Sequence, residues 1–165
     1  MSEPAPLFRE EQRFTQPWLW LCVALAAVAA LVAVAVVLFD NDDNGTGWPM
    51  AIVLVIVGVG IPLLFALARL RVNVLADRVE IRYRPFVTRT ILLEDVMAAE
   101  SVTYHPLREY GGWGIKGWSR RKIAYNVRGD RGALLTLADG RTVLIGSQQP
   151  DELAAAIRDG LSTGK

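Results

Sequence analysis

Residue types that carry out chemistry are few in this sequence of 165 residues, and none of them forms a catalytic or metal-binding pattern. His105 is the only histidine and has no cysteine or aspartate partner at a motif spacing, which favours a surface or strand-end position over a general base. Cys22 is the only cysteine, so an internal disulfide and a metal-binding cysteine pair are excluded. The adjacent Glu94 and Asp95 fit a turn better than an acid–base pair. The sequence therefore predicts a protein that is not an enzyme and holds no cofactor or metal.

Two short patterns match part of a ligand-binding motif but lack its context. Residues 112–117 (GWGIKG) have the glycine spacing of a dinucleotide-binding loop, yet they do not lie between a strand and a helix of a βαβ unit. Residues 40–45 (DNDDNG) match the first half of a calcium-binding loop. The twelfth position of that loop requires a bidentate glutamate, and here it is Ala51. Neither pattern is predicted to be a site.

The most distinctive chemistry lies in residues 108–125 (REYGGWGIKGWSRRKIAY), where tryptophans and basic residues alternate with glycines. Tryptophan favours the membrane interface, and each basic side chain near anionic lipid gains roughly 1 kcal/mol. One hypothesis is a loop that touches the inner leaflet or a lipid headgroup. The alternatives are that the tryptophans pack on their own domain with the charges solvated, or that the loop contacts a partner protein. The candidate contact residues are Arg108, Trp113, Lys116, Trp118, Arg120, Arg121 and Lys122.

Two long apolar blocks precede this stretch. Residues 18–39 and residues 50–68 contain no charge, and at about 1.5 Å per residue each helix would be long enough to cross a hydrocarbon core of about 30 Å. The first block lacks the short apolar core and the small-residue cleavage site of a signal peptide. Neither block contains the ionisable residues that mark ion pathways, which argues against a pump or channel. We expect a transmembrane hairpin over residues 18–68, with residues 1–17 as an N-terminal tail.

The charge distribution predicts the orientation of this hairpin. The connecting loop, residues 40–49, carries three aspartates and no basic residue, whereas arginines flank both blocks on their other side. Because Lys and Arg accumulate on the cytoplasmic side, we expect a two-pass protein of the plasma (inner) membrane with both termini in the cytosol. Residues 69–165 hold 16 Lys or Arg and 11 Asp or Glu, an excess of five that favours an anionic leaflet and equally follows from the orientation rule. No nucleic-acid-binding motif accompanies these charges, and nucleic acid is not a predicted partner.

The remaining residues, 71–165, show the patterns of a mainly β domain. Apolar and charged residues alternate over residues 78–84, which is typical of a strand with one buried face. Asp139-Gly140 is a strong hairpin signal, and residues 150–152 open an amphipathic C-terminal helix. We expect about seven antiparallel strands in a sandwich or partly open barrel, capped by that helix.

Three segments of this region resemble bacterial pleckstrin-homology-like (PH-like) domains that are attached to membrane hairpins. These segments are VNVLADRVEIRYRP, ILLEDVMAAESV and LADGRTVLIGSQQPDELAAAI, which together cover most of residues 71–157. The resemblance implies a scaffold for lipid or protein binding. One hypothesis is a membrane-anchored binding module that contacts the inner leaflet or an anionic lipid headgroup. The alternative is a structural or assembly subunit that binds another membrane protein. Small residues in the hairpin fit either close packing within it or a homo-oligomer contact.

Overall fold

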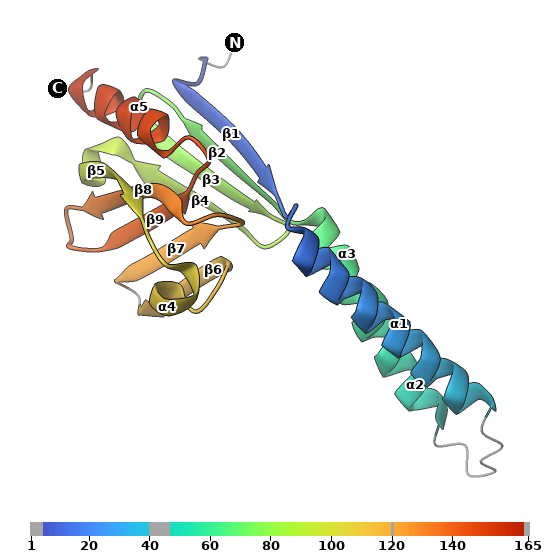
Figure 1. Cartoon of the computed structure of the whole chain (residues 1–165). Coiled ribbons are helices and arrows are strands. Elements are labelled where there is room, and N and C mark those ends of the chain that lie inside the picture. The colour runs from blue at the N-terminus through green and yellow to red at the C-terminus, as the bar shows by residue number, and fades with distance from the viewer. Residues whose placement is uncertain (1–4, 40–46, 120, 164–165) are drawn as a thin grey trace. The chain divides into compact units, whose positions relative to one another are not determined.

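The chain consists of two compact units in the computed structural model, which describes residues 5–39, 47–119 and 121–163 (Figure 1). The β unit comprises residues 1–13 and 69–165, and the helical unit comprises residues 14–68. The chain therefore leaves the β unit after a short N-terminal segment, forms the helical unit, and then completes the β unit.

The helical unit contains two long apolar helices. The first is α1 (Pro17–Phe39), and the second runs without a break through α2 (Gly47–Val55), the π-helical turn η1 (Ile56–Gly60) and α3 (Ile61–Leu67). By length and composition, both are able to cross a membrane, which confirms the two predicted apolar helices. The predicted acidic loop and its partial calcium pattern fall mainly on residues 40–46, which lie outside the described residues.

A proline explains the π-helical turn in the second helix. Pro62 has no N–H group to donate to the carbonyl of Gly58, and its ring crowds that carbonyl. The wider π-helical turn lies immediately before the proline, where it accommodates the missing hydrogen bond. At the same level, Gly58 permits close packing between the two helices, because an added Cβ would lie 2.5 Å from the Cβ of Ala30. Small residues thus pack the hairpin against itself at this point.

The first sheet of the β unit, called sheet A here, has four antiparallel strands in the order β1-β2-β3-β4. The strands are β1 (Phe8–Arg13), β2 (Arg69–Val74), β3 (Arg78–Arg84) and β4 (Val87–Leu92). Alternate residues of β2 and β3 are buried, as the period-2 pattern predicts. The segment predicted as an N-terminal tail thus contributes the edge strand β1, which pairs with β2 from Phe8 opposite Val74 to Arg13 opposite Arg69.

The second sheet, sheet B, has five strands in the order β5-β8-β9-β7-β6. These are β5 (Val96–Thr103), β6 (Gly114–Ser119), β7 (Lys122–Asn126), β8 (Arg131–Leu137) and β9 (Thr142–Gly146). The structure corrects two details of the expected fold. The described residues form nine strands in two open sheets, not about seven, and β7 pairs with β9 in parallel. The predicted Asp139-Gly140 turn is confirmed between the antiparallel strands β8 and β9.

Three short or terminal helices complete the β unit. They are η2 (Leu93–Asp95), α4 (Pro106–Tyr110) and α5 (Pro150–Thr163). The apolar stripe of α5, including Leu153 and Ile157, is fully buried, and the helix packs mainly on β5 and β8. The predicted C-terminal capping helix is therefore confirmed, with its proline and two acidic residues in the first turn.

Polar side chains attach β1 to the corner between β9 and α5. The Gln12 side chain is buried and donates from Nε2 to the carbonyl of Gly146 at 2.8 Å. The Glu10 carboxylate accepts hydrogen bonds from the Ser147 hydroxyl at 2.5 Å and from the backbone N–H of Gln148 at 2.8 Å. The strand that precedes α1 in the chain is therefore held by both sheets of the β unit.

Candidate functional site

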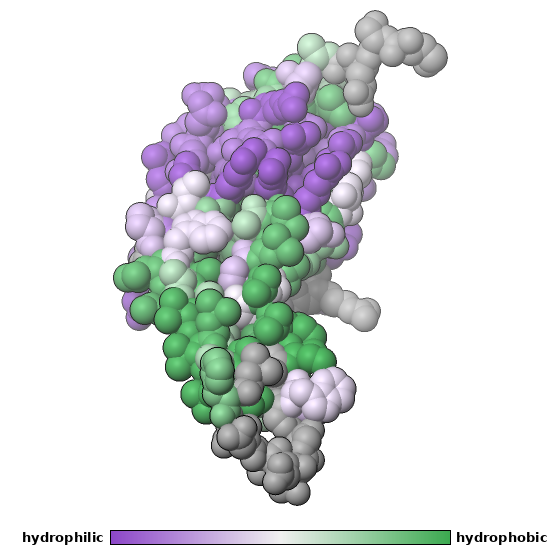
Figure 2. All heavy atoms as spheres, turned by 90° about the vertical axis from the view of Figure 1, so that its right-hand side faces the viewer, coloured by the Kyte–Doolittle hydropathy of each residue, from purple (hydrophilic) through white to green (hydrophobic). Residues whose placement is uncertain are grey.

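One exposed face of sheet A is rich in arginine. The inward-facing residues of β1, β2 and β3 form part of the core, so the alternate residues project from the opposite face. This face, called the arginine face here, carries seven arginines and two glutamates, a difference of five positive charges. Its charged residues are Arg9, Glu11, Arg13, Arg69, Arg71, Arg78, Glu80, Arg82 and Arg84. Viewed from the side of β1, the β unit is predominantly hydrophilic (Figure 2).

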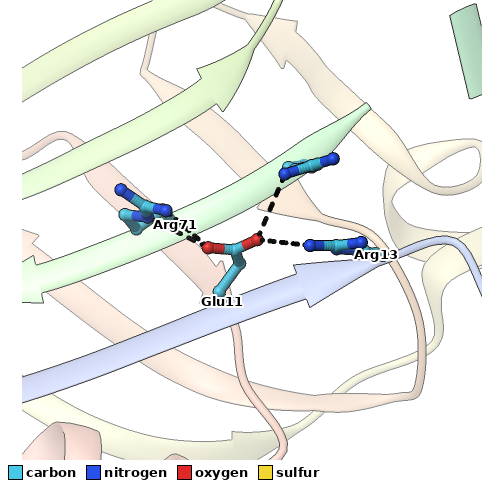
Figure 3. A network of polar contacts seen from close by, with 4 residues as sticks. Glu11, Arg13 and Arg71 are labelled. Atoms are coloured by element: carbon cyan, nitrogen blue, oxygen red, sulfur yellow. Dashed lines mark hydrogen bonds and ion pairs between the residues drawn. The ribbon is translucent and has the colours of Figure 1, made fainter. Parts of the chain in front are cut away.

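The first glutamate of this face lies among three arginines (Figure 3). The Glu11 carboxylate accepts from Arg71 at 2.6 Å and from Arg13 at 3.3 Å, and a nitrogen of Arg69 lies 3.8 Å away. The hydrogen bond from Arg71 is the main reason that the pKa of Glu11 lies below its ordinary value. One carboxylate thus faces three guanidinium groups, which leaves two positive charges in this cluster.

The second glutamate, Glu80, is less exposed to solvent than Glu11 and binds two arginines. The Glu80 carboxylate accepts from Arg78 at 3.1 Å and from Arg82 at 2.8 Å. Only 13% of the Glu80 side chain is exposed, and Arg78 forms a further ion pair with Asp77 at 2.9 Å. Arg78 and Arg82 are therefore largely engaged within the protein.

Three arginines of this face stand directly opposite one another on adjacent strands. Arg13 pairs in register with Arg69, and Arg69 pairs with Arg84. Like charges in directly opposite positions destabilise a sheet, so this arginine row has a cost to folding. Among the described residues, no ion pair reaches Arg84, and Glu11 is the only carboxylate within 4 Å of a guanidinium nitrogen of Arg13 or Arg69. A row of exposed, incompletely balanced guanidinium groups is a suitable surface for phosphate or carboxylate.

The arginine row also has a particular place in the chain. Three residues separate Arg13 from the start of α1, and Ala68 alone separates Arg69 from the end of α3. Two of the three strands that carry the row, β1 and β2, are therefore the ones that continue into the two apolar helices. Sequence reasoning used these arginines to orient the hairpin, to count the charge excess and, over residues 78–84, to predict a strand with one buried face, but it did not combine them into one surface. Their alternation in RLRVNV and RVEIRYR was the signal that could have placed them on one face.

The residues of the predicted 108–125 contact loop are distributed over several elements. Trp113 is half-buried, and its Nε1 donates to the carbonyl of Gly129 at 3.1 Å. The Lys122 ammonium lies 4.7 Å from the centre of the buried Tyr110 ring. These two side chains contact the β unit itself, as expected for a loop that packs on its own domain.

The other predicted residues of this loop lie on different elements or are less fully described. Arg108 is exposed on α4, Lys116 is half-buried on β6, and the exposed Arg121 precedes β7. Only the backbone of Trp118 is described, and Arg120 lies outside the described residues. The described members of this set thus lie on α4, β6 and the start of β7, which adjoin one another. Contact of this loop with lipid stays a prediction.

A buried asparagine fixes the backbone of the 108–125 segment. Asn126 is fully buried, accepts from the N–H of Gly114 at 2.8 Å and donates to the Tyr104 hydroxyl at 3.1 Å. The Tyr104 and Tyr110 rings meet edge to face with centroids 5.7 Å apart. Burial raises the pKa of Tyr104 to about 12, and it raises the pKa of Tyr83 in sheet A to about 12 as well.

These tyrosine pKa values predict a loss of stability at alkaline pH. Between pH 10 and about 12, unfolded tyrosine loses its proton while folded Tyr83 keeps it, so the unfolding free energy is highest below pH 10 and decreases as pH rises. The slope is up to about 1.4 kcal/mol per pH unit for each tyrosine. Denaturant unfolding across this range measures it. A Tyr83→Phe variant, which retains the ring, should show a smaller decrease, because Tyr104 and Tyr110, whose pKa values burial also raises, still contribute. An unchanged slope in that variant would contradict the assignment.

Neither comparison with known proteins identifies a family. No model of a known protein family matches the sequence, and no curated protein matches it significantly. Within the described ranges, no group of three or more His, Cys, Asp or Glu is arranged to hold a metal ion. An open groove of about 640 Å³ is lined by apolar residues that include Leu92, Met97 and Leu161, together with the acidic Asp77 and Glu94. The arginine face therefore remains the surface with the most specific chemistry.

Proposed function

We propose that this protein is a non-enzymatic, membrane-anchored binding module whose β unit contacts anionic lipid headgroups through the arginine face. The observation that carries this proposal is the excess of five positive charges on one exposed sheet face, whose strands β1 and β2 continue into the two apolar helices. Arginine is suited to such contacts because its planar guanidinium group binds phosphate through two parallel hydrogen bonds.

The proposed setting is the plasma (inner) membrane, crossed twice, with both termini in the cytosol. Two apolar helices of sufficient length support the crossing, and the flanking arginines support this orientation. The anionic cytoplasmic leaflet would then adjoin the β unit, and each basic residue close to it would gain roughly 1 kcal/mol. Residues Arg108, Lys116 and Arg121 of the 108–125 segment are a second proposed contact with the same leaflet.

We also propose a PH-like class for the scaffold. A four-stranded antiparallel sheet, a second sheet and a C-terminal helix follow one another in the order that the resemblance implies. The parallel β7–β9 pair departs from the all-antiparallel arrangement expected of that class. The lipid proposal does not depend on the class, because it rests on the charges of sheet A.

A spin label on the arginine face tests the proposed lipid contact in the full-length protein. Thr88 is exposed and pairs in register with Arg82, so a Thr88→Cys label on a Cys22→Ala background reports on this face. In vesicles of phosphatidylcholine with added phosphatidylglycerol, we expect the label to be less accessible to an aqueous relaxation agent than in phosphatidylcholine alone. High salt should restore the accessibility, since ions screen exposed charges over about 10 Å at 0.1 M.

The matched control is a label at Ser101→Cys on β5, an exposed position of sheet B, which should respond less to lipid composition. Equal accessibility at Thr88→Cys in both vesicle types and at every salt concentration would overturn the proposal. In that case the alternative function, a structural or assembly subunit that binds another membrane protein, would be favoured.

A further inference from the structure

We propose that the arginine row, formed by Arg13, Arg69 and Arg84, is a discrete headgroup site that selects lipids with two phosphates over lipids with one. This inference rests on the proposed function of the arginine face and specifies its ligand. The general attraction of a basic face depends only on total charge, whereas a discrete site also depends on how the charges are spaced.

The register of sheet A sets the spacing of the row. Its three arginines occupy directly opposed positions on the adjacent strands β1, β2 and β3. Adjacent strands lie about 4.8 Å apart, so the backbones of Arg13 and Arg84 are separated by roughly 10 Å. A single phosphate binds the guanidinium groups of two neighbours, which leaves the third without an anion. Two phosphates joined by a short bridge engage all three.

The local charge balance favours the same ligand. The row and the adjacent Arg71 contribute four positive charges, and Glu11 contributes one negative charge, which leaves three positive charges. The shortest contact of Glu11 is made with Arg71, at 2.6 Å, while its contacts to Arg13 and Arg69 are longer, at 3.3 and 3.8 Å. A ligand with two negative charges neutralises most of this excess, and a ligand with one leaves two charges unbalanced.

The row is also more accessible than the other arginine cluster of the face. The side chains of Arg13 and Arg69 are 56% and 43% exposed. The second cluster is organised around Glu80, whose side chain is only 13% exposed and which holds Arg78 and Arg82 by hydrogen bonds. A phosphate would have to compete with that partly buried carboxylate for Arg78, whereas no ion pair within the described residues occupies Arg84.

The chain connections identify a membrane lipid as the source of the phosphates. Two of the three strands that carry the row, β1 and β2, continue into helices that are long and apolar enough to cross a membrane. Basic clusters immediately cytoplasmic of a membrane helix are the usual recognition sites for anionic headgroups. A headgroup with two phosphates, such as that of diphosphatidylglycerol, is therefore the ligand we assign to the row.

The test uses the full-length protein in phosphatidylcholine vesicles at matched total charge. One set contains diphosphatidylglycerol, and the other contains twice the mole fraction of phosphatidylglycerol. The quantity measured is the amount of each anionic lipid retained when the protein is extracted in mild detergent. We expect diphosphatidylglycerol to be retained about fivefold more, since one further basic residue near a phosphate has roughly that effect.

Two matched variants separate the row from the rest of the face. Arg84→Gln and Arg78→Gln each remove one positive charge from the outer side of β3, at its two ends. The preference for diphosphatidylglycerol should be lost in Arg84→Gln and kept in Arg78→Gln. A second variant of the row, Arg13→Gln, should behave like Arg84→Gln, and thermal unfolding confirms that each variant is folded.

The other outcomes overturn the inference in distinguishable ways. Equal retention of the two lipids at matched charge, or equal loss of preference in Arg84→Gln and Arg78→Gln, would reject a discrete row and leave the proposed function intact. No enrichment of either anionic lipid would reject the proposed function as well. Binding of inorganic pyrophosphate by protein in pure phosphatidylcholine vesicles, at the affinity shown for diphosphatidylglycerol, would assign the row to a soluble phosphate and reject the lipid.

Discussion

A chain in which a two-residue Asn-Gly turn replaces residues 14–68 is expected to fold as a water-soluble β unit. The replaced residues are the helical unit, and the two residues left at the junction, Arg13 and Arg69, are paired in register on antiparallel neighbours. Two-residue Asn-Gly loops join antiparallel strands of this kind. The variant should elute as a folded species without detergent and unfold cooperatively in urea, because no strand of either sheet is removed.

The matched control begins at Arg69 and therefore lacks β1. Its loss removes the buried Phe8 and Gln12, and the carboxylate of Glu10 that holds Ser147 and Gln148. Burial of one aromatic side chain contributes about 1.5–3 kcal/mol, and hydrogen bonds to a charged group contribute about 1.5–3 kcal/mol each. The sum, roughly 4.5–9 kcal/mol, is comparable with the whole stability of a small domain.

We therefore expect the chain without β1 to be largely unfolded or aggregated under conditions in which the turn-joined chain is folded. Size-exclusion chromatography without detergent and urea unfolding compare the two directly. Equal midpoints and equal slopes in urea would show that β1 contributes little, and they would contradict the role assigned to Glu10 and Gln12. A fragment that starts at residue 71, the boundary suggested by the sequence, lacks Arg69 and Leu70 in addition.

The elements that the sequence predicts well are those whose pattern is local. Uninterrupted apolar blocks can be recognised from length alone, and both long helices are present. In β3, three apolar residues alternate with charged ones, and the structure buries them on one side. The amphipathic C-terminal helix follows from the same kind of local periodicity.

Strand β1 was not predicted because most of its inward positions are polar. Of the alternate residues of FREEQR that face the protein, only Phe8 is apolar, so no period-2 hydrophobic signal exists. The Glu10 carboxylate and the Gln12 side-chain nitrogen are hydrogen-bonded to groups more than 130 positions away in the chain. The parallel pairing of β7 with β9 is likewise a choice between distant segments, and local patterns do not specify it.

The candidate site, like strand β1, could be predicted only in part from local sequence patterns. The arginines are visible in the sequence as a charge excess, but the arginine row exists only because the register brings residues 13, 69 and 84 together. The composition of the 108–125 segment likewise left open whether its tryptophans and basic residues contact lipid, their own domain or a partner protein. The structure directs Trp113 toward Gly129 and Lys122 toward Tyr110. Composition identifies which side chains could bind a ligand, whereas the surrounding turns and strands set the direction in which each side chain points.

Removal of the Glu11 carboxylate is expected to change stability and lipid contact in opposite directions. In Glu11→Gln, three arginines lose their shared negative partner, and the excess on the arginine face rises from five to six charges. The unfolding free energy should fall by up to about 1 kcal/mol, the upper range for ion pairs that are exposed to solvent. Retention of anionic lipid should rise about fivefold, because the carboxylate no longer competes with phosphate.

The pH dependence provides a second measurement on the same variant. Because the pKa of Glu11 in the folded protein lies below its ordinary value of 4.5, its contribution to stability is present above pH 4.5 and is lost as pH falls through the folded pKa. Glu11→Gln should therefore differ most from the parent protein near neutral pH and converge with it in acid.

The matched control for Glu11→Gln is Glu100→Gln on sheet B, which makes the same charge change outside the arginine face. It should alter neither lipid retention nor stability by a comparable amount. If Glu11→Gln lowered both stability and lipid retention, the carboxylate would be organising the arginines for the ligand. The expected result, lower stability with higher lipid retention, instead means that Glu11 competes with lipid phosphate for Arg13 and Arg69. The Glu11 carboxylate therefore stabilises the fold and at the same time lowers the lipid affinity of the arginine face.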